Sequence, residues 1–199
     1  ACGLNPNYAE AHANRGTLLA DLGRTNDAAA AFVTALRLSP GNADLLVAYG
    51  NMLLRMSRLD DAVASFEKAA ALNPTLVLAH KGRGRAMFEL GRFKDAMESF
   101  DRAIRLATDD ADCLWGRGYA RKAMGETATA KQDFEQALRA NPEHHGALYE
   151  TGRQNEALQS YERAIAREPN DLNLYCDKAI IEQELQDRKS TRLNSSHVR

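Results

Sequence analysis

The sequence predicts an all-α solenoid, a stack of antiparallel helix pairs joined by short turns. The main observation is a period of 34 residues that runs through four successive units. Within each unit one glycine, two alanines and one phenylalanine keep fixed places, and alanine, a strong helix former, is common throughout. The four columns are Gly16, Gly50, Gly84 and Gly118; Ala28, Ala62, Ala96 and Ala130; Phe32, Phe66, Phe100 and Phe134; and Ala35, Ala69, Ala103 and Ala137.

Each column has a physical reason. The glycine lies in the first helix of a pair and the first alanine lies early in the second, so that the two backbones can approach closely. The phenylalanine and the second alanine follow at i+4 and i+7 from the first alanine, which places all three on one helix face. A proline then ends the second helix, because the residue before a proline resists the α conformation. The prolines are Pro40, Pro74 and Pro142, with Thr108 at the remaining place.

The turns between paired helices carry a glycine where a helix ends in the left-handed conformation, namely Gly23, Gly91 and Gly125, and Ser57 replaces it in the second unit. The boundaries of the helices follow from these turns and from the prolines. We expect first helices at 9–22, 43–56, 77–90 and 111–124, and second helices at 25–38, 59–72, 93–106 and 127–140.

The start of the chain and its fifth unit depart from the period. Residues 1–8 align with the end of a truncated preceding repeat. In the shortened repeat at 145–170, Ala157 follows Ala130 by 27 residues instead of 34, and the deficit falls in the first helix. Seven residues are close to two helical turns, so the remaining helix keeps its angular phase. Two alternatives explain the deficit: a repeat that became shorter during evolution, or a loss of coding sequence. Residues 171–186 predict the first helix of an incomplete repeat.

The C-terminal residues 187–199 break the repeat pattern. Residues 187–197 read DRKSTRLNSSH, which agrees codon by codon with a common sequencing-adapter oligonucleotide. We therefore expect a non-native tail here, and we expect the chain to be a fragment of a longer protein.

The columns resemble the tetratricopeptide repeat family. Its pattern of Gly, Ala-x3-Phe, Ala and Pro in a 34-residue helix–turn–helix is met by 9–42, 43–76, 77–110 and 111–144. The tryptophan of the family's first helix is replaced by His12, Leu46, His80 and Leu114. The resemblance, to arrays of the bacterial type, implies a right-handed superhelical solenoid whose first helices line a concave groove. It also implies a protein or peptide ligand.

Composition and motifs argue against other classes of function. The formal net charge is −1, which gives no basic field for nucleic acid, and no apolar run is long enough to span a membrane. Cys2, Cys113 and Cys176 match no zinc spacing or redox pair, so we expect thiols in a reducing compartment, with the cytoplasm favoured. The histidines are too scattered for a shared metal, and no phosphate loop or catalytic motif occurs. We expect no enzyme activity, metal or cofactor.

The groove implied by the resemblance combines cations with aromatic rings in the middle of the array. This mixture suits an extended peptide with an acidic group and an apolar side chain. Packing between adjacent units is an equal alternative for Trp115 and Tyr119. The candidate groove residues are Asn14, Thr17, Asn51, Lys81, Arg85, Phe88, Trp115, Tyr119 and Lys122.

The leading interpretation is a non-catalytic scaffold that binds a protein or peptide segment. One alternative is the substrate-recruiting repeat segment of a larger bacterial enzyme, such as an O-linked glycosyltransferase. Arrays of that kind often carry an asparagine ladder, of which only Asn14 is present. Self-association through the exposed truncated ends is a further expectation.

Overall fold

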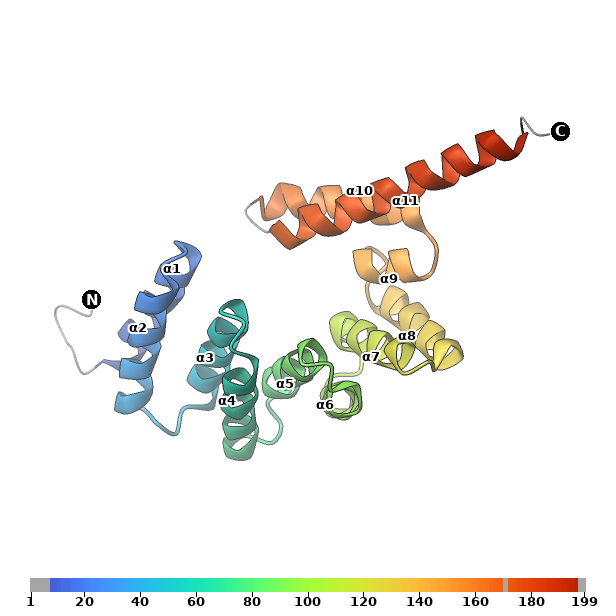
Figure 1. The fold of residues 1–199 in the computed structure, drawn as a ribbon. Coiled ribbons are helices and arrows are strands. Elements are labelled where there is room, and N and C mark those ends of the chain that lie inside the picture. Colours follow the sequence, from blue (N-terminus) through green and yellow to red (C-terminus); the bar gives the residue numbers. More distant parts are fainter. Residues whose placement is uncertain (1–7, 170–171, 197–199) are drawn as a thin grey trace. The chain divides into compact units, whose positions relative to one another are not determined.

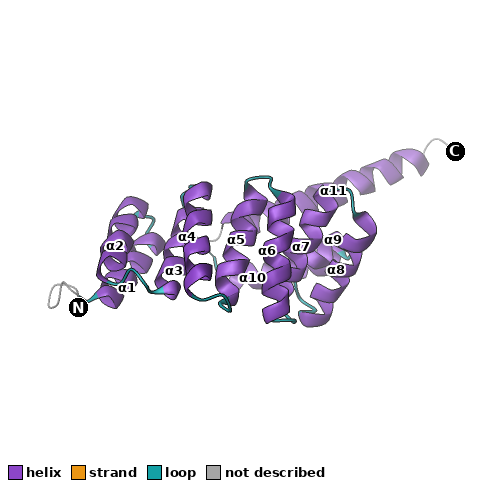
Figure 2. Cartoon of the chain, turned by 90° about the horizontal axis from the view of Figure 1, so that it is seen from below, coloured by secondary structure: helices purple, strands orange, loops and turns teal. Residues whose placement is uncertain are grey.

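The computed structural model describes residues 8–169 and 172–196, and these form eleven α-helices and no strand (Figures 1 and 2). The all-α prediction is therefore confirmed. The helices are α1 (Ala9–Asp21), α2 (Thr25–Leu38), α3 (Ala43–Arg55), α4 (Leu59–Leu72), α5 (Val77–Glu89), α6 (Phe93–Leu106), α7 (Ala111–Ala123), α8 (Thr127–Ala140), α9 (His145–Glu150), α10 (Gln154–Arg167) and α11 (Leu172–Ser196).

The helices lie where the repeat columns place them. The second helices α2, α4, α6 and α8 begin and end at the expected residues. The first helices α1, α3 and α5 end one residue earlier than expected, because Leu22, Met56 and Leu90 serve as their C-caps.

The turn inside each helix pair is closed by the same pair of backbone hydrogen bonds. At the α5–α6 turn the Arg92 amide donates to the Met87 carbonyl over 2.9 Å, and Gly91, at φ 74°, donates to Phe88 over 2.9 Å. At the α3–α4 turn Ser57 adopts the same left-handed conformation, with φ 56°. A side chain is strained there, because its Cβ crowds the following carbonyl oxygen. The second repeat therefore forms the same turn as the others, but the left-handed backbone of Ser57 costs free energy that a glycine would not.

The helices group into two compact units. The first unit comprises Ala1–Thr108 with Tyr119–Glu126, and the second comprises Asp109–Gly118 with Thr127–Arg199. In the first unit α1 packs on α2, α3 on α4 and α5 on α6, while α3 also contacts both α1 and α5 (Figure 1). The first helices of this unit therefore lie next to one another and share one face, which we call the first-helix face.

The core of the first unit is built from the phenylalanine column. Phe32, Phe66 and Phe100 are buried, and each ring lies against the glycine of its own repeat. A Cβ on Gly50 would lie 2.7 Å from the Phe66 ring, closer than atoms can approach. The glycine thus makes room for an aromatic ring, which is a more specific role than close approach of the two backbones.

Phe66 is also enclosed by a glycine of the next repeat. A Cβ on Gly82 would lie even closer to the same ring than one on Gly50. Gly82 stands outside the glycine column. The places one and two repeats earlier hold Ala48 and Asn14, and the place one repeat later holds Gly116. The contact of Gly82 with Phe66 ties the second repeat to the third.

The second unit contains a buried ion pair that the columns do not predict. Arg117 of α7 donates to both carboxylate oxygens of Asp133 on α8, at 2.5 Å and 3.1 Å. Asp133 is 2% exposed and the Arg117 side chain 14%. Beside the pair, Phe134 lies against Gly118 as in the other repeats. The fourth repeat therefore places a charge pair where the second repeat has Tyr49 and Ser65.

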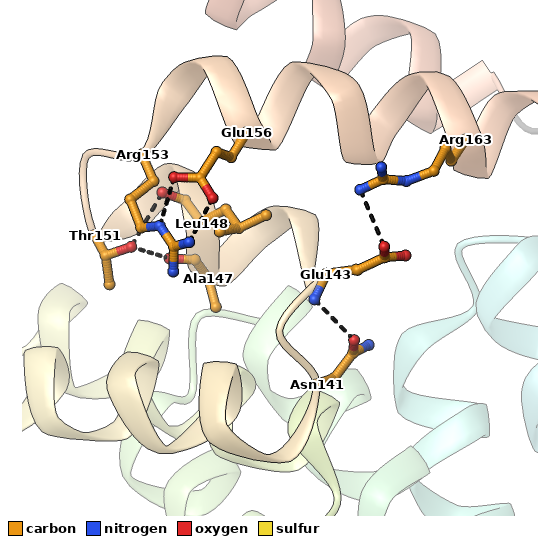
Figure 3. A network of polar contacts seen from close by, with 8 residues as sticks. All are labelled: Asn141, Glu143, Ala147, Leu148, Thr151, Arg153, Glu156 and Arg163. Atoms are coloured by element: carbon orange, nitrogen blue, oxygen red, sulfur yellow. Dashed lines mark hydrogen bonds and ion pairs between the residues drawn. The ribbon is translucent and has the colours of Figure 1, made fainter.

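The first helix of the shortened repeat is α9, which is six residues long. His144 caps its start, since its Nδ1 accepts a hydrogen bond from the Ala147 amide over 3.1 Å. At its end the Thr151 hydroxyl donates to the Ala147 and Leu148 carbonyls, and Arg153 pairs with Glu156 at the start of α10 (Figure 3). Leu148 is buried with Ala157, Tyr161 and Ile181 in a small core shared by α9, α10 and α11. The angular phase expected for this helix stays a prediction.

The last helix extends beyond its expected end. The sequence predicts a first helix to residue 186, whereas α11 continues without a break to Ser196. Helical geometry says nothing about where these codons come from, so the non-native origin of 187–199 stays a prediction. Residues 197–199, and residues 1–7 of the expected truncated repeat, lie outside the described part of the chain.

Candidate peptide-binding surface

The candidate groove residues of the first two repeats are polar and accessible. Asn14 and Thr17 on α1 and Asn51 on α3 lie at least partly open to solvent. The Thr17 hydroxyl donates to the Ala13 carbonyl one turn earlier, over 3.3 Å. A hydroxyl engaged in this way still has lone pairs with which to accept from a ligand amide.

The cations of the third repeat lie on α5. Arg85 is 67% exposed and its Nε donates to Glu89 over 3.0 Å, one turn further along the helix. An exposed pair of this kind is worth about 0.3–0.5 kcal/mol. Lys81, one turn before Arg85, is half-buried. The Arg85–Glu89 pair is weak enough for Arg85 to exchange its partner for a ligand carboxylate.

The aromatic residues of the first unit form a run. The Phe88 and Tyr119 rings meet edge to face with centroids 5.3 Å apart, a favoured aromatic geometry. The Lys122 ammonium lies 5.5 Å from the centre of the Tyr119 ring, within cation–π distance. Phe88 also meets Phe93 of α6, with centroids 5.4 Å apart. The structure thus brings Phe88, Tyr119 and Lys122 of the predicted set together and adds Phe93.

Trp115 belongs to the second unit. Its indole lies beside the His144 ring at 5.8 Å, and a Cβ on Gly146 would come within 2.7 Å of the indole nitrogen. The Nε2 of His144 is in turn 3.2 Å from Asp112. Trp115 is half-buried, so packing accounts for one side of the ring. A contribution of Trp115 to ligand binding stays a prediction.

Charge is unevenly distributed over the first-helix face. In the first two repeats Glu10 and Asp44 are exposed acids, and Asp21 is paired with Arg55 at 3.1 Å. Lys81, Arg85 and Lys122 lie in the third repeat and in the part of α7 that belongs to this unit. The end of the face at α5 and α7 therefore attracts negative charge.

An open pocket of about 400 Å³ lies at the α5–α6 turn, within the first unit. The repeat columns do not predict it, because Phe93 occupies a place that holds Thr25, Leu59 and Thr127 in other repeats. An aromatic residue at the start of a second helix was the available signal. The pocket is lined by Gly91, Arg92, Phe93, Lys94, Asp95 and Met124.

Other kinds of site find little support in the described ranges. Among those residues no group of three or more His, Cys, Asp or Glu side chains could hold a metal ion. No helix of the described chain is both long and apolar enough to cross a membrane. In the second unit burial, together with the Asp177 carboxylate, raises the pKa of Tyr161 well above its ordinary value. That phenol therefore stays protonated, as expected of a residue that serves in packing.

The fold and the first-helix face together define a class of protein, an all-α repeat array with aromatic and cationic side chains on one face. The tetratricopeptide repeat pattern matches residues 13–77, 50–111 and 116–171. The chain belongs to the tetratricopeptide repeat family. No curated protein gives a significant match to the chain.

Solved structures of the same family share the fold at low sequence identity. A thermophilic tetratricopeptide repeat protein of Thermus thermophilus is 22% identical, with a TM-score of 0.70 over 88% of this chain and 99% of that one. YrrB, described as having an unusual peptide-binding site, is 23% identical, with a TM-score of 0.64 over 90% and 96%. MamA is 24% identical, with a TM-score of 0.64 over 79% and 96%. At such identities the likeness establishes the fold alone.

Proposed function

We propose that this chain is a non-catalytic interaction scaffold that binds an extended segment of a partner protein on the first-helix face of the first unit. The observation that carries the proposal is the association of Phe88, Tyr119 and Lys122 beside the exposed Arg85. Arginine, tyrosine and tryptophan dominate the energy of protein interfaces, and rings already packed together lose little entropy when they bind. Repeat arrays of this family and the peptide-binding site named for YrrB support the same interpretation.

The proposed ligand segment is acidic and carries an apolar side chain. Its carboxylates pair with Arg85, Lys81 and Lys122, and its apolar group contacts Tyr119 and Phe88. The polar residues Asn14, Thr17 and Asn51 contact the ligand backbone further along the face. Charge-assisted hydrogen bonds are about twice as strong as neutral ones, so the cations supply more of the affinity than these polar contacts do.

A charge-matched pair of variants tests the proposal. Arg85→Glu with Lys122→Glu reverses two charges on the first-helix face. Lys68→Glu with Arg102→Glu reverses two charges on the second helices α4 and α6 and serves as the control. The probe is an array of short peptides that combine Asp or Glu with one Phe, Leu or Tyr.

The first pair should weaken binding about 100-fold or more, since it removes two charged hydrogen bonds, each worth about 1.5–3 kcal/mol. The control should retain binding, because Lys68 and Arg102 lie on second helices, outside the proposed surface, while the net charge changes by the same amount. Equal loss in both pairs would show only a long-range effect of charge, and undiminished binding by the first pair would refute the assigned surface.

A further inference from the structure

We propose that the pocket at the α5–α6 turn receives one bulky apolar side chain of the acidic partner segment, an inference that rests on the proposed function. The pocket would then anchor the segment beside the first-helix face. The apolar residues of the lining and its net charge each support this assignment.

The apolar part of the pocket lining is suited to an apolar side chain. Phe93 and Met124 contribute its large apolar groups, from the start of α6 and the turn after α7. Its volume of about 400 Å³ lies in the range of ligand-binding pockets. Methionine is flexible and polarizable, so Met124 can adapt to an aromatic or an aliphatic occupant.

The pocket continues the aromatic run of the first-helix face. Phe93 meets Phe88 at 5.4 Å, and Phe88 meets Tyr119 at 5.3 Å. An extended chain advances about 3.3–3.6 Å per residue, so roughly three residues span these two steps. These two steps end at Tyr119, and the side chain of a Glu placed over that ring can bridge the remaining 5.5 Å to the Lys122 ammonium. The segment should therefore carry its apolar anchor about three residues from this Glu.

The charge of the pocket lining favours an acidic segment on either side of the apolar side chain. Arg92 and Asp95 neutralise each other through an ion pair of 2.8 Å, so the net charge of the lining comes from the exposed Lys94. At the preceding α3–α4 turn, Asp60 occupies the place of Lys94 and Leu59 occupies the place of Phe93. An acidic segment is thus attracted at the α5–α6 turn and repelled at the otherwise equivalent α3–α4 turn.

The test uses two fluorescein-labelled acidic peptides, one with a Phe three residues from a Glu and one with Gly in place of that Phe. Binding is measured by anisotropy and by NMR of ¹³C-labelled methionine methyl groups, with the Met124 signal assigned from Met124→Leu. The Phe peptide should shift the Met124 signal and leave that of Met56, at the equivalent place in the second repeat, unmoved. Replacing Phe by Gly should weaken binding about 10- to 100-fold.

Charge variants complete the test. Lys94→Asp should weaken the Phe peptide about two- to fivefold, and Asp60→Lys should not weaken it. Both residues are exposed, and unchanged circular dichroism would show that the fold is kept.

The two proposals fail in different ways. If binding depends on Arg85 and Lys122 but neither moves the Met124 signal nor requires the Phe, the pocket proposal is overturned and the proposed function stands. If the Met124 signal moves but Arg85→Glu with Lys122→Glu has no effect, the pocket is supported and the first-helix face is not. The absence of any binding by the acidic peptides would overturn both.

Discussion

The buried ion pair between Arg117 and Asp133 gives a prediction whose size follows from the structure. Replacing Arg117 by Tyr leaves the carboxylate of Asp133, 2% exposed, without its two hydrogen bonds from the guanidinium. Removal of one partner of such a pair costs about 3–5 kcal/mol, because the remaining charge is buried without compensation. Arg117→Tyr should therefore rank among the most destabilising single substitutions in the second unit.

The chain itself supplies the rescuing change. The second repeat holds Tyr49 and Ser65 at these two places, and the Ser65 hydroxyl donates to the Leu46 carbonyl over 2.9 Å. Adding Asp133→Ser to Arg117→Tyr should recover most of the loss, leaving a net change of about 1 kcal/mol or less, since uncharged replacement of a buried pair is often nearly neutral. The coupling energy of the double-mutant cycle should exceed about 2 kcal/mol.

Urea unfolding followed by tryptophan fluorescence measures this effect locally. Trp115 is the single tryptophan of the chain and lies in the second unit with Arg117 and Asp133, so its emission reports on that unit. Far-ultraviolet circular dichroism reports the whole chain in the same samples. Arg85→Tyr, which breaks the exposed pair with Glu89, is the control and should cost less than about 1 kcal/mol. A loss in Arg117→Tyr no larger than in this control, or no recovery in the double variant, would refute the reasoning.

Two further predictions concern the first unit, and thermal or urea unfolding followed by circular dichroism checks both. Ser57→Gly should stabilise the chain by about 1 kcal/mol, because it removes the strain of a serine in the left-handed conformation. Gly91→Ser, the reverse change at the equivalent place of the next repeat, should cost a similar amount. A lower stability of Ser57→Gly would contradict this account of the turn. Gly82→Ala should cost about 1–3 kcal/mol by overpacking against the Phe66 ring. Gly41→Ala, where an added Cβ meets no atom within 4 Å, should be neutral, and equal effects of the two would exclude a specific clash.

The helices were predictable because each rests on residues that recur. Phe66 and Gly50 reappear 34 residues later as Phe100 and Gly84, so that one ring-to-glycine contact specifies every pair. The acid of the buried ion pair, which the columns miss, occurs once at its place. Asp133 has Ala31, Ser65 and Ser99 at the equivalent places, and a repeat pattern carries no information about a contact made in one repeat alone.

The candidate surface was predictable to a smaller extent. Phe88, Tyr119 and Lys122 share helix faces, and the structure brings them together as the spacing indicates. Trp115 packs in the other unit against His144, a residue of the connection before the shortened repeat. His144 and Gly146, which Trp115 contacts, lie where the shortened repeat begins, and a periodic pattern does not describe that junction. The roles of all these residues in binding stay predictions.

The enclosure of Phe66 by Gly50 and Gly82 bears on the elasticity of the first unit. A ring held against backbone on two sides cannot slide without breaking contact, so the joint between the second and third repeats is stiff. Phe32 instead meets the Tyr49 ring at 6.2 Å, and two rings can slip over each other at little cost. We therefore expect the joint between the first and second repeats to be the more compliant of the two, and to yield first when a ligand spreads α1 from α3.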